Sequence, residues 1–279
     1  MGGLGNNFFQ LNYAYYLRSQ GYVVIINVSL LMKNNFVSKI LRWSQHYSYN
    51  CLCQLDLLDN FILNKKINIF ILLYASLSKY FKCFFINTKY CGLATPKPKD
   101  LQCLKVQSLH LFGYFHVDNP ININFRFKIN HEINNIINSN FKLLTVIDRM
   151  HSVNTVVIHV RGGDFLNNNY CSLGSTYYDN SLNEVADHRG ISFCVITNDQ
   201  KFAKNILNIE DFYFVDSCSA LEDFAILVKS RFKILSNSTF AWWSGELSDE
   251  NSTIIEPFSY YGKRSWQPIS LKTRIKVKN

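Results

Sequence analysis

A cation and a carboxylate flank a glycine pair near the middle of the chain, directly after a run of β-branched residues. The run covers residues 155–160, and Arg161 and Asp164 stand on either side of Gly162 and Gly163. Such a run predicts a buried strand, and open α/β sheets bind ligands at the carboxyl ends of parallel strands. The planar guanidinium of arginine suits phosphate. The segment therefore predicts a phosphate-binding corner, and the alternative is a surface turn with an ion pair.

Two further polar loops follow apolar runs later in the chain. One is Thr197-Asn198-Asp199, and the other is residues 236–239, which precede a helical pattern. The N–H groups and the dipole at a helix N-terminus favour an anion. Because the carboxyl ends of parallel strands meet at one edge, the three loops together predict a ligand that contains phosphate. The candidate binding residues are His159, Arg161, Asp199, Ser236, Asn237, Ser238 and Thr239.

The elements that must position these loops alternate between strand and helix from about residue 150 onward, as in βαβ units around a parallel sheet. The expected strands are residues 155–160, 192–197, 212–215 and 232–235. The expected helices are residues 178–188, 201–207, 221–229 and 240–247. Ser238 or Thr239 would be a good N-cap for the last helix. This half of the chain therefore predicts an α/β fold whose sheet gathers the three loops at one edge.

The N-terminal half is less regular. The glycines of residues 2–5 predict a loop that leads into an amphipathic helix, and residues 22–27 and 109–115 predict short strands. The polar, asparagine-rich segment at residues 130–140 is the expected interdomain boundary. The size of the chain suits two domains of ordinary length. The predicted domains are residues 1–145 and 146–279.

Composition narrows the class of partner. The chain has 279 residues, of which 48% are hydrophobic and 18% charged, with a net charge of +9 and a pI of about 9.1. A basic balance favours a phosphorylated small molecule, an anionic membrane surface or a nucleic acid. Nucleic acid is the least favoured, because the basic residues are scattered and form no continuous helix face. The apolar run at residues 67–77 is shorter than the roughly 20 residues that cross a bilayer. It predicts a buried helix or a segment that lies on a membrane surface.

Cysteine usage and the N-terminus indicate the compartment. The eight cysteines form no Cys-x-x-Cys pair and have no zinc-finger spacing with histidine. This usage is typical of a reduced, cytosolic protein. The N-terminus opens with glycines and lacks the basic-then-apolar profile of a signal peptide. We therefore expect a cytoplasmic protein.

Several nucleotide-binding signatures do not occur in the sequence. Residues 3–8 miss the GxGxxG fingerprint because Phe8 stands where the last glycine is needed. No Walker A pattern occurs, which disfavours a P-loop kinase. No Asp-x-Asp occurs either, so the usual carboxylate pair for a metal-bound sugar nucleotide is missing. These absences disfavour the common metal-bound and P-loop modes of phosphate binding.

Four motifs occur in order along the chain. Residues 2–6 are GGLGN followed by Phe9-Gln10, residues 113–115 are GYF, residues 159–164 are HVRGGD and residues 236–243 are SNSTFAWW. They resemble the GGLGNQxFQ, GYFQ, HxRRxD and SNSSFSWW elements of the α-1,2-fucosyltransferases of glycosyltransferase family 11. The resemblance runs from residue 2 to about residue 260. Each motif alone is moderately specific, and the ordered set is strongly so.

The resemblance implies a GT-B type α/β fold with two Rossmann-like domains facing a cleft. Residues 1–145 would form the acceptor side and residues 146–279 would bind GDP-fucose. The implied reaction is an inverting, metal-independent transfer of L-fucose from GDP-fucose to the 2-hydroxyl of a galactose residue. The acceptor would be a galactose-terminated oligosaccharide on a lipid carrier, a precursor of an O-antigen or capsule. The protein would then contact the cytoplasmic face of the inner membrane peripherally. The alternatives are a transferase of the same fold with another GDP-sugar or linkage, and a catalytically weak nucleotide-sugar-binding protein.

The resemblance also suggests residue roles. Arg161 would stabilise the charge that grows on the β-phosphate. Further donors would come from residues 236–239 and from Gly2, Gly3, Gly5 and Asn6. His159 and Asp199 would hold the guanine and ribose, although a histidine in an apolar strand is often only a core residue. Asp164 would be a general base, an acceptor anchor or the group that orients Arg161. Trp242-Trp243 would pack beneath the turn or form a platform for the sugar.

Two departures from the family pattern bear on these roles. Gly162 stands where the family has a second arginine, so the phosphate grip relies on Arg161 alone or on another cation such as Arg231 or Lys233. Family members usually have a short β-strand before the GGLG element, whereas this chain has one residue there. We therefore expect either that the first strand is missing or that the natural start lies upstream.

Overall fold

The structure is a computed structural model that divides into two compact units, Met1–Ile129 and Asn130–Asn279. It describes residues 3–28, 46–59, 61–65, 88–92, 110–113, 121–163, 166, 172–185, 190–215, 219–260, 270 and 272–278. The apolar run at residues 67–77 lies outside the described residues. In the described part, none of the helices combines the length and the apolar character needed to cross a bilayer. The boundary expected between residues 145 and 146 falls within helix α7 (Phe141–Ser152).

The second unit is built on a six-stranded sheet in which every described pair of neighbours is parallel. The strands are β5 (Thr155–Val160), β6 (Ser192–Thr197), β7 (Tyr213–Phe214), β8 (Phe232–Ile234), β9 (Thr253–Pro257) and β10 (Ile275–Val277). Their order is β10-β9-β8-β5-β6-β7. The chain therefore builds outward from β5 through β6 to β7, and then returns to the other side of β5 to add β8, β9 and β10. The predicted parallel α/β sheet is confirmed.

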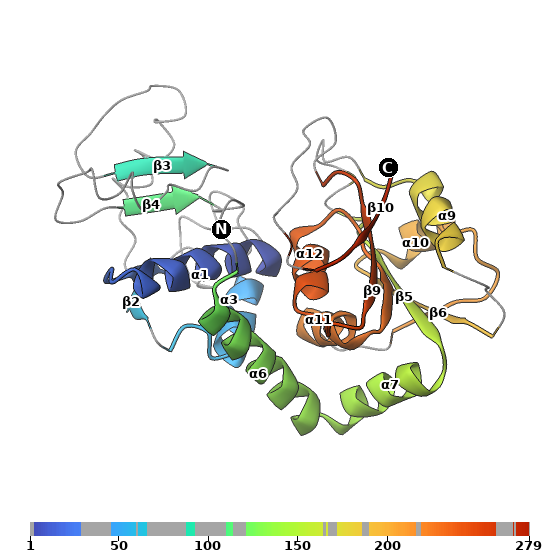
Figure 1. The fold of residues 1–279 in the computed structure, drawn as a ribbon, viewed down its shortest axis with the longest axis horizontal. Coiled ribbons are helices and arrows are strands. Elements are labelled where there is room, and N and C mark those ends of the chain that lie inside the picture. The colour runs from blue at the N-terminus through green and yellow to red at the C-terminus, as the bar shows by residue number, and fades with distance from the viewer. Residues whose placement is uncertain are drawn as a thin grey trace. The chain divides into compact units, whose positions relative to one another are not determined.

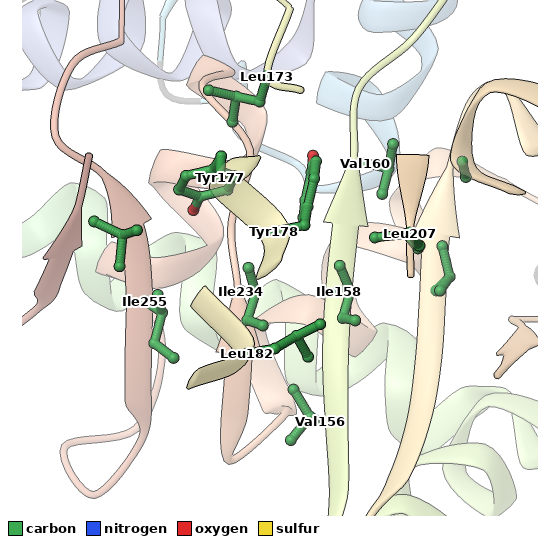
Figure 2. Close-up of a cluster of buried hydrophobic side chains, with 13 residues drawn as sticks. Val156, Ile158, Val160, Leu173, Tyr177, Tyr178, Leu182, Leu207, Ile234 and Ile255 are labelled. Carbon is green, nitrogen blue, oxygen red and sulfur yellow. The ribbon is translucent and has the colours of Figure 1, made fainter. Parts of the chain in front are cut away.

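Helices cover both faces of this sheet, which explains why β5 is buried along its whole length. The helices α9 (Ser175–Asn183) and α10 (Gln200–Ile206) lie on one face, and α11 (Ala220–Lys229) and α12 (Thr239–Glu246) lie on the other (Figure 1). Figure 2 shows alternate residues of β5 on the α9 side, where Val156, Ile158 and Val160 pack near Tyr177 and Tyr178. A parallel strand covered on both faces is expected to be a near-continuous apolar run, as this one is.

Side-chain caps begin the helices at the positions that the strand–loop–helix pattern requires. Asp199 Oδ1 accepts from Phe202 N at 3.0 Å at the start of α10. Ser238 Oγ accepts from Ala241 N at 3.1 Å at the start of α12. Such caps are worth about 1 kcal/mol each. Of the two N-caps considered for α12, Ser238 is the one that the structure shows.

The first unit is described in separate pieces. It contains α1 (Leu4–Ser19), α3 (His46–Gln54) and two short parallel pairs of strands. The pairs are β1 (Ile25–Asn27) with β2 (Ile62–Asn64), and β3 (Thr88–Gly92) with β4 (His110–Gly113). Phe8 and Tyr15 of α1 pack around Phe125, with ring centroids 6.3 and 5.4 Å from it. Burial of these rings fixes α1 against the start of the next long helix.

The polar segment at residues 130–140, expected to be a boundary, is mostly the second half of helix α6 (Ile123–Ser139). Phe125, Ile129, Ile133 and Ile137 recur at intervals of four and are all buried. This spacing places them on one face of a helix. The asparagines between them obscure that pattern in the sequence. The two compact units divide between Ile129 and Asn130, so the segment expected at the boundary does begin there, but it is helical.

Candidate functional site

The central polar site lies at the carboxyl ends of β5 and β8, which are neighbours in the sheet although the chain passes through β6 and β7 between them. This is the point where the strand order reverses, and open α/β sheets bind ligands in the crevice outside it. His159, near the end of β5, meets Ser236, which follows β8: Nδ1 and Oγ are 2.7 Å apart. The loops after the two strands are thus joined at the switch point.

Two tyrosines of α9 fix the same strand ends from the other face of the sheet. Tyr178 donates its hydroxyl to the His159 carbonyl at 3.3 Å, and Tyr177 donates to the Leu235 carbonyl at 2.6 Å. Both rings are buried. These two bonds tie the ends of β5 and β8 to the same helix and hold the two loops at a fixed spacing.

His159 is part of the wall of the site. Its side chain is 5% exposed and stacks on Phe240, with ring centroids 5.6 Å apart. Burial, with a smaller effect from the neighbouring Arg161, lowers the pKa of His159 from 6.5 to about 3. The imidazole is therefore neutral near pH 7, so it cannot attract phosphate by charge or donate a proton as an imidazolium.

The turn that follows β8 combines hydroxyl groups with a helix N-terminus. Ser236 donates to Ser238 Oγ over 3.4 Å, and Ser238 caps α12. Ser236, Asn237 and Ser238 are buried, whereas Thr239 is half-buried. The first N–H groups of α12 lack partners within the helix, and with the helix dipole they suit an anion.

Arg161 follows β5 directly and is half-buried. The two glycines after it are hydrogen-bonded to the loop that follows β6. Gly162 N donates to Asn198 Oδ1 at 3.0 Å, and Gly163 N donates to Asp199 Oδ2 at 3.3 Å. Since Asp199 also caps α10, each of its carboxylate oxygens accepts a backbone N–H. The predicted residues His159, Arg161, Asp199 and Ser236–Thr239 are thus brought together along one edge.

A pocket of about 300 Å³ continues this edge past β6. It lies where β6 and β7 end and α11 begins, with Phe214 and Val215 on one side and the Asp223 carboxylate among its polar groups. Its lining residues are Val195, Ile196, Thr197, Gln200, Phe214, Val215, Ser219, Ala220 and Asp223. Sequence reasoning did not identify Ser219 and Asp223 as site residues. The signal was present, because Ser219 followed by Glu222 before an apolar run is typical of a helix start.

Two cations considered as substitutes for a second arginine lie elsewhere. Lys233 is 1% exposed, and its Nζ donates to the carbonyls of Leu227 and Val228 and to Ser248 Oγ. Burial lowers the pKa of Lys233 well below its usual range. Arg231 is exposed and precedes β8, at the amino end of that strand. The expectation that either could reach phosphate at the carboxyl edge was wrong.

The N-terminal candidates belong to the first unit. Helix α1 begins at Leu4 with Gly3 as N-cap, so Gly5 and Asn6 lie in its first turn and not in a loop. The space around Gly3 is open, and a helix N-terminus of this kind can bind an anion. Gly2 and Asp164 lie outside the described residues.

The tryptophan pair packs behind the turn. Trp242 and Trp243 are 2% and 0% exposed, and their rings meet edge to face at 5.1 Å. The guanidinium of Arg274 lies 5.2 Å from the Trp242 ring. This burial supports packing beneath the turn and opposes a platform for a sugar.

Comparison with known proteins matches a family model described as Glycosyl transferase family 11 to residues 58–272, well over half of the chain. The O-antigen biosynthesis glycosyltransferase WbnK of Escherichia coli is 25% identical over 162 residues, which is 54% of this chain and 53% of that protein. An alpha-1,2-colitosyltransferase of Escherichia coli is 24% identical over 131 residues, 42% of this chain and 44% of that protein. The matched regions thus span about half the length of these curated relatives. No solved structure matches.

Proposed function

The chain belongs to glycosyl transferase family 11, and we propose that it transfers L-fucose from GDP-fucose to the 2-hydroxyl of a galactose residue. The transfer is inverting and uses no metal, and the acceptor is an O-antigen or capsule precursor. The observation that carries the proposal is the junction of the β5 and β8 loops, where His159 Nδ1 and Ser236 Oγ lie 2.7 Å apart beside Arg161. It places Arg161 and the N-terminus of α12 on two loops that meet at the same edge of the sheet, and a diphosphate can use both a guanidinium and a helix N-terminus.

In this proposal the donor lies along the carboxyl edge of the sheet. The diphosphate contacts Arg161 and the N-terminus of α12, and the guanine enters the pocket bounded by β6, β7 and α11. Phe214 and Val215 on one side of this mostly polar pocket can contact the face of a purine ring. The Asp223 carboxylate can accept from the adjacent N1–H and amino groups of guanine. His159 and Asp199 then support the loops, because both already hydrogen-bond within them.

The chemistry follows from the charges. The acceptor oxygen attacks the anomeric carbon, the bond from that carbon to the β-phosphate oxygen breaks, and GDP leaves with the electron pair. Arg161 and the α12 N–H groups stabilise the charge that grows on the phosphate, and one such donor is typically worth about 3–4 kcal/mol. The proton of the hydroxyl passes to a base. Neutral His159, with a pKa of about 3, is too weak a base for that step, so Asp164 is the proposed base.

We further propose a fold of the GT-B type, in which residues 1–145 would serve the acceptor and the N-terminus of α1 would supply donors to the diphosphate. The net charge of +9 favours peripheral contact with anionic lipid at the cytoplasmic face of the inner membrane. Such contact would bring the enzyme to a lipid-linked acceptor.

Colitose is the second candidate for the transferred sugar. One of the relatives is named an alpha-1,2-colitosyltransferase. The same phosphate and guanine contacts would serve any GDP-linked sugar, because they do not touch the sugar ring. The choice between fucose and colitose therefore rests with residues around the sugar itself.

The test is a transfer assay with radiolabelled GDP-fucose, GDP-colitose and galactose-terminated oligosaccharides, in the presence of EDTA. We expect fucose transfer with a new α-1,2 linkage, assigned by NMR of the product. Arg161→Ala should slow transfer at least about a hundredfold, since it removes the cation at the departing phosphate.

Arg231→Ala is the matched control, because this arginine lies at the amino end of β8; it should keep transfer near the wild-type rate. Binding of GDP without transfer from either donor would contradict the proposal. Equal loss in the two arginine variants would remove Arg161 from its assigned role.

A further inference from the structure

We propose that Asn198 is a positioning residue that fixes Arg161 at the switch point, and that Gly162 is the residue this positioning requires. The proposal rests on the proposed function to the extent that Arg161 binds the diphosphate of the donor. In the family pattern Gly162 counts as a missing arginine. In the structure Gly162 is hydrogen-bonded to Asn198 and leaves no room for a larger residue.

The side-chain amide of Asn198 makes two reciprocal hydrogen bonds with the backbone of Gly162. Its Oδ1 accepts from Gly162 N at 3.0 Å, and its Nδ2 donates to Gly162 O at 3.2 Å. Strands β5 and β6 are paired up to Val160 and Thr197. The amide therefore continues the ladder beyond the point where the strands end, and it holds both polar groups of the residue next to Arg161.

The loop that carries Asn198 is itself anchored. Asp199 caps α10 through Phe202 N at 3.0 Å, and its other carboxylate oxygen accepts from Gly163 N at 3.3 Å. Thr197 Oγ1 accepts from Asp199 N at 3.0 Å. The Asn198–Asp199 loop is thus bonded to α10 on one side and to Gly162 and Gly163 on the other. A change in this loop should therefore shift the backbone that carries Arg161.

The glycine pair fits this loop too closely for any other residue. A Cβ on Gly162 would lie 2.8 Å from Asp199 Cβ and 2.9 Å from Phe202 Cδ1. A Cβ on Gly163 would lie 2.8 Å from Asn198 Nδ2, and the φ of Gly163 is +61°. A second arginine at position 162 would thus force Asp199 and the start of α10 to move. The Asn198–Asp199 loop occupies the space that a second arginine at position 162 would need, so this loop is compatible with Arg161 alone.

A group that stabilises a departing phosphate depends on its position, and a shift of about 1 Å can cost up to a hundredfold in rate. We expect Asn198→Ala to lower the rate of fucose transfer about tenfold or more, with a smaller change in KM for GDP-fucose. Asn198→Asp keeps the acceptor for Gly162 N but sets a carboxylate oxygen against Gly162 O, so it should also lower the rate. Gly162→Arg should lower the rate and not raise it.

The decisive experiment is a double-mutant cycle of Arg161→Ala and Asn198→Ala, measured on the full chain both as fucose transfer and as GDP affinity by calorimetry. If Asn198 acts through Arg161, its effect disappears when Arg161 is already alanine. A merely structural role would give the same loss in both backgrounds and would overturn the proposal. Asn208→Ala is the matched control, because its amide bonds to Asp179 in the same unit and not to either loop.

The outcomes separate this inference from the proposed function. If the wild type binds GDP but transfers no sugar, the proposed function fails and the GDP-affinity cycle still tests Asn198. If the wild type transfers fucose and the cycle is additive, only the inference fails. If Asn198→Ala does not fold, the same cycle with Asn198→Asp applies. A faster Gly162→Arg enzyme would also overturn the inference.

Discussion

Both ends of helix α12 are rich in polar side chains, but one end lies at the ligand-binding edge and the other is held inside the fold. At the N-terminal end, Ser236 and Ser238 hydrogen-bond to His159 and to the helix backbone, and the first N–H groups of the helix reach the edge where ligands bind. At the C-terminal end, Glu246 is fully buried and bonded to Arg274, which also bonds to Glu256. The first end can accept a ligand, whereas at the second end the charged groups are paired with one another inside the fold.

The C-terminal end is held by a network around one guanidinium. Arg274 Nη2 lies 2.9 Å from Glu246 Oε2, and Nη1 lies 2.6 Å from Glu256 Oε2. Ser270 donates to Glu246 and Tyr260 donates to Glu256. Residues of α12, β9 and the segment before β10 meet here. The comparison therefore suggests that burial of charge alone does not indicate function; what matters is whether the polar groups face the ligand edge.

The largest expected effect comes from breaking the C-terminal network. Arg274→Met would leave Glu246 and Glu256 buried without their guanidinium, which should lower the free energy of unfolding by about 3–5 kcal/mol. Urea unfolding at pH 7 measures this. The triple variant with Glu246→Gln and Glu256→Gln in addition should recover part of the loss, since no buried charge remains. An Arg274→Met protein that unfolds like the wild type would contradict a structural role for the network.

The sequence predicted one end of α12 much better than the other. The strands β5 to β8 and the turn after β8 have local signatures: β-branched runs, a serine N-cap and polar loops at strand ends. Strands β9 and β10 were not predicted, although β9 begins with the β-branched run Thr-Ile-Ile. The Arg274 network has no local signature, because its partners are far apart in the chain. The same limit explains Lys233, which the sequence offered as a second phosphate-binding cation but which instead donates to carbonyls at the end of α11. It also explains Gly162, which fits Asp199 and Phe202 in a way that no motif encodes.

A smaller effect is expected at the N-terminal end of α12, where the stability contributed by His159 should depend on pH. The pKa of His159 is lowered from 6.5 to about 3 in the folded protein, so the unfolded chain binds a proton that the native chain does not. Stability that depends on neutral His159 is therefore complete above about pH 6.5 and decreases as the pH falls toward 3. The slope is about 1.4 kcal/mol per pH unit, or about 2 kcal/mol by pH 5.

His159→Asn is the variant that reveals this slope, since an amide nitrogen can replace Nδ1 beside Ser236. Urea unfolding between pH 4.5 and 7 should show the wild type losing stability relative to the variant as the pH falls. Parallel curves for the two proteins would mean that His159 can be protonated without cost in the folded state. That result would also weaken the argument against His159 as a base.

The smallest effect compares two helix caps that should cost the same stability and differ only in function. Ser238 caps α12 at the ligand edge, and Asn122, directly before α6, accepts from Phe125 N at 3.2 Å in the first unit. Each change to alanine should lower the free energy of unfolding by about 1 kcal/mol, measured by urea unfolding. Only Ser238→Ala should also weaken GDP binding in calorimetry, because it disturbs the N–H groups proposed to hold the diphosphate. If both caps changed GDP affinity equally, or neither did, the N-terminus of α12 would lose its assigned role and the two ends of the helix would differ only in how they hold the fold.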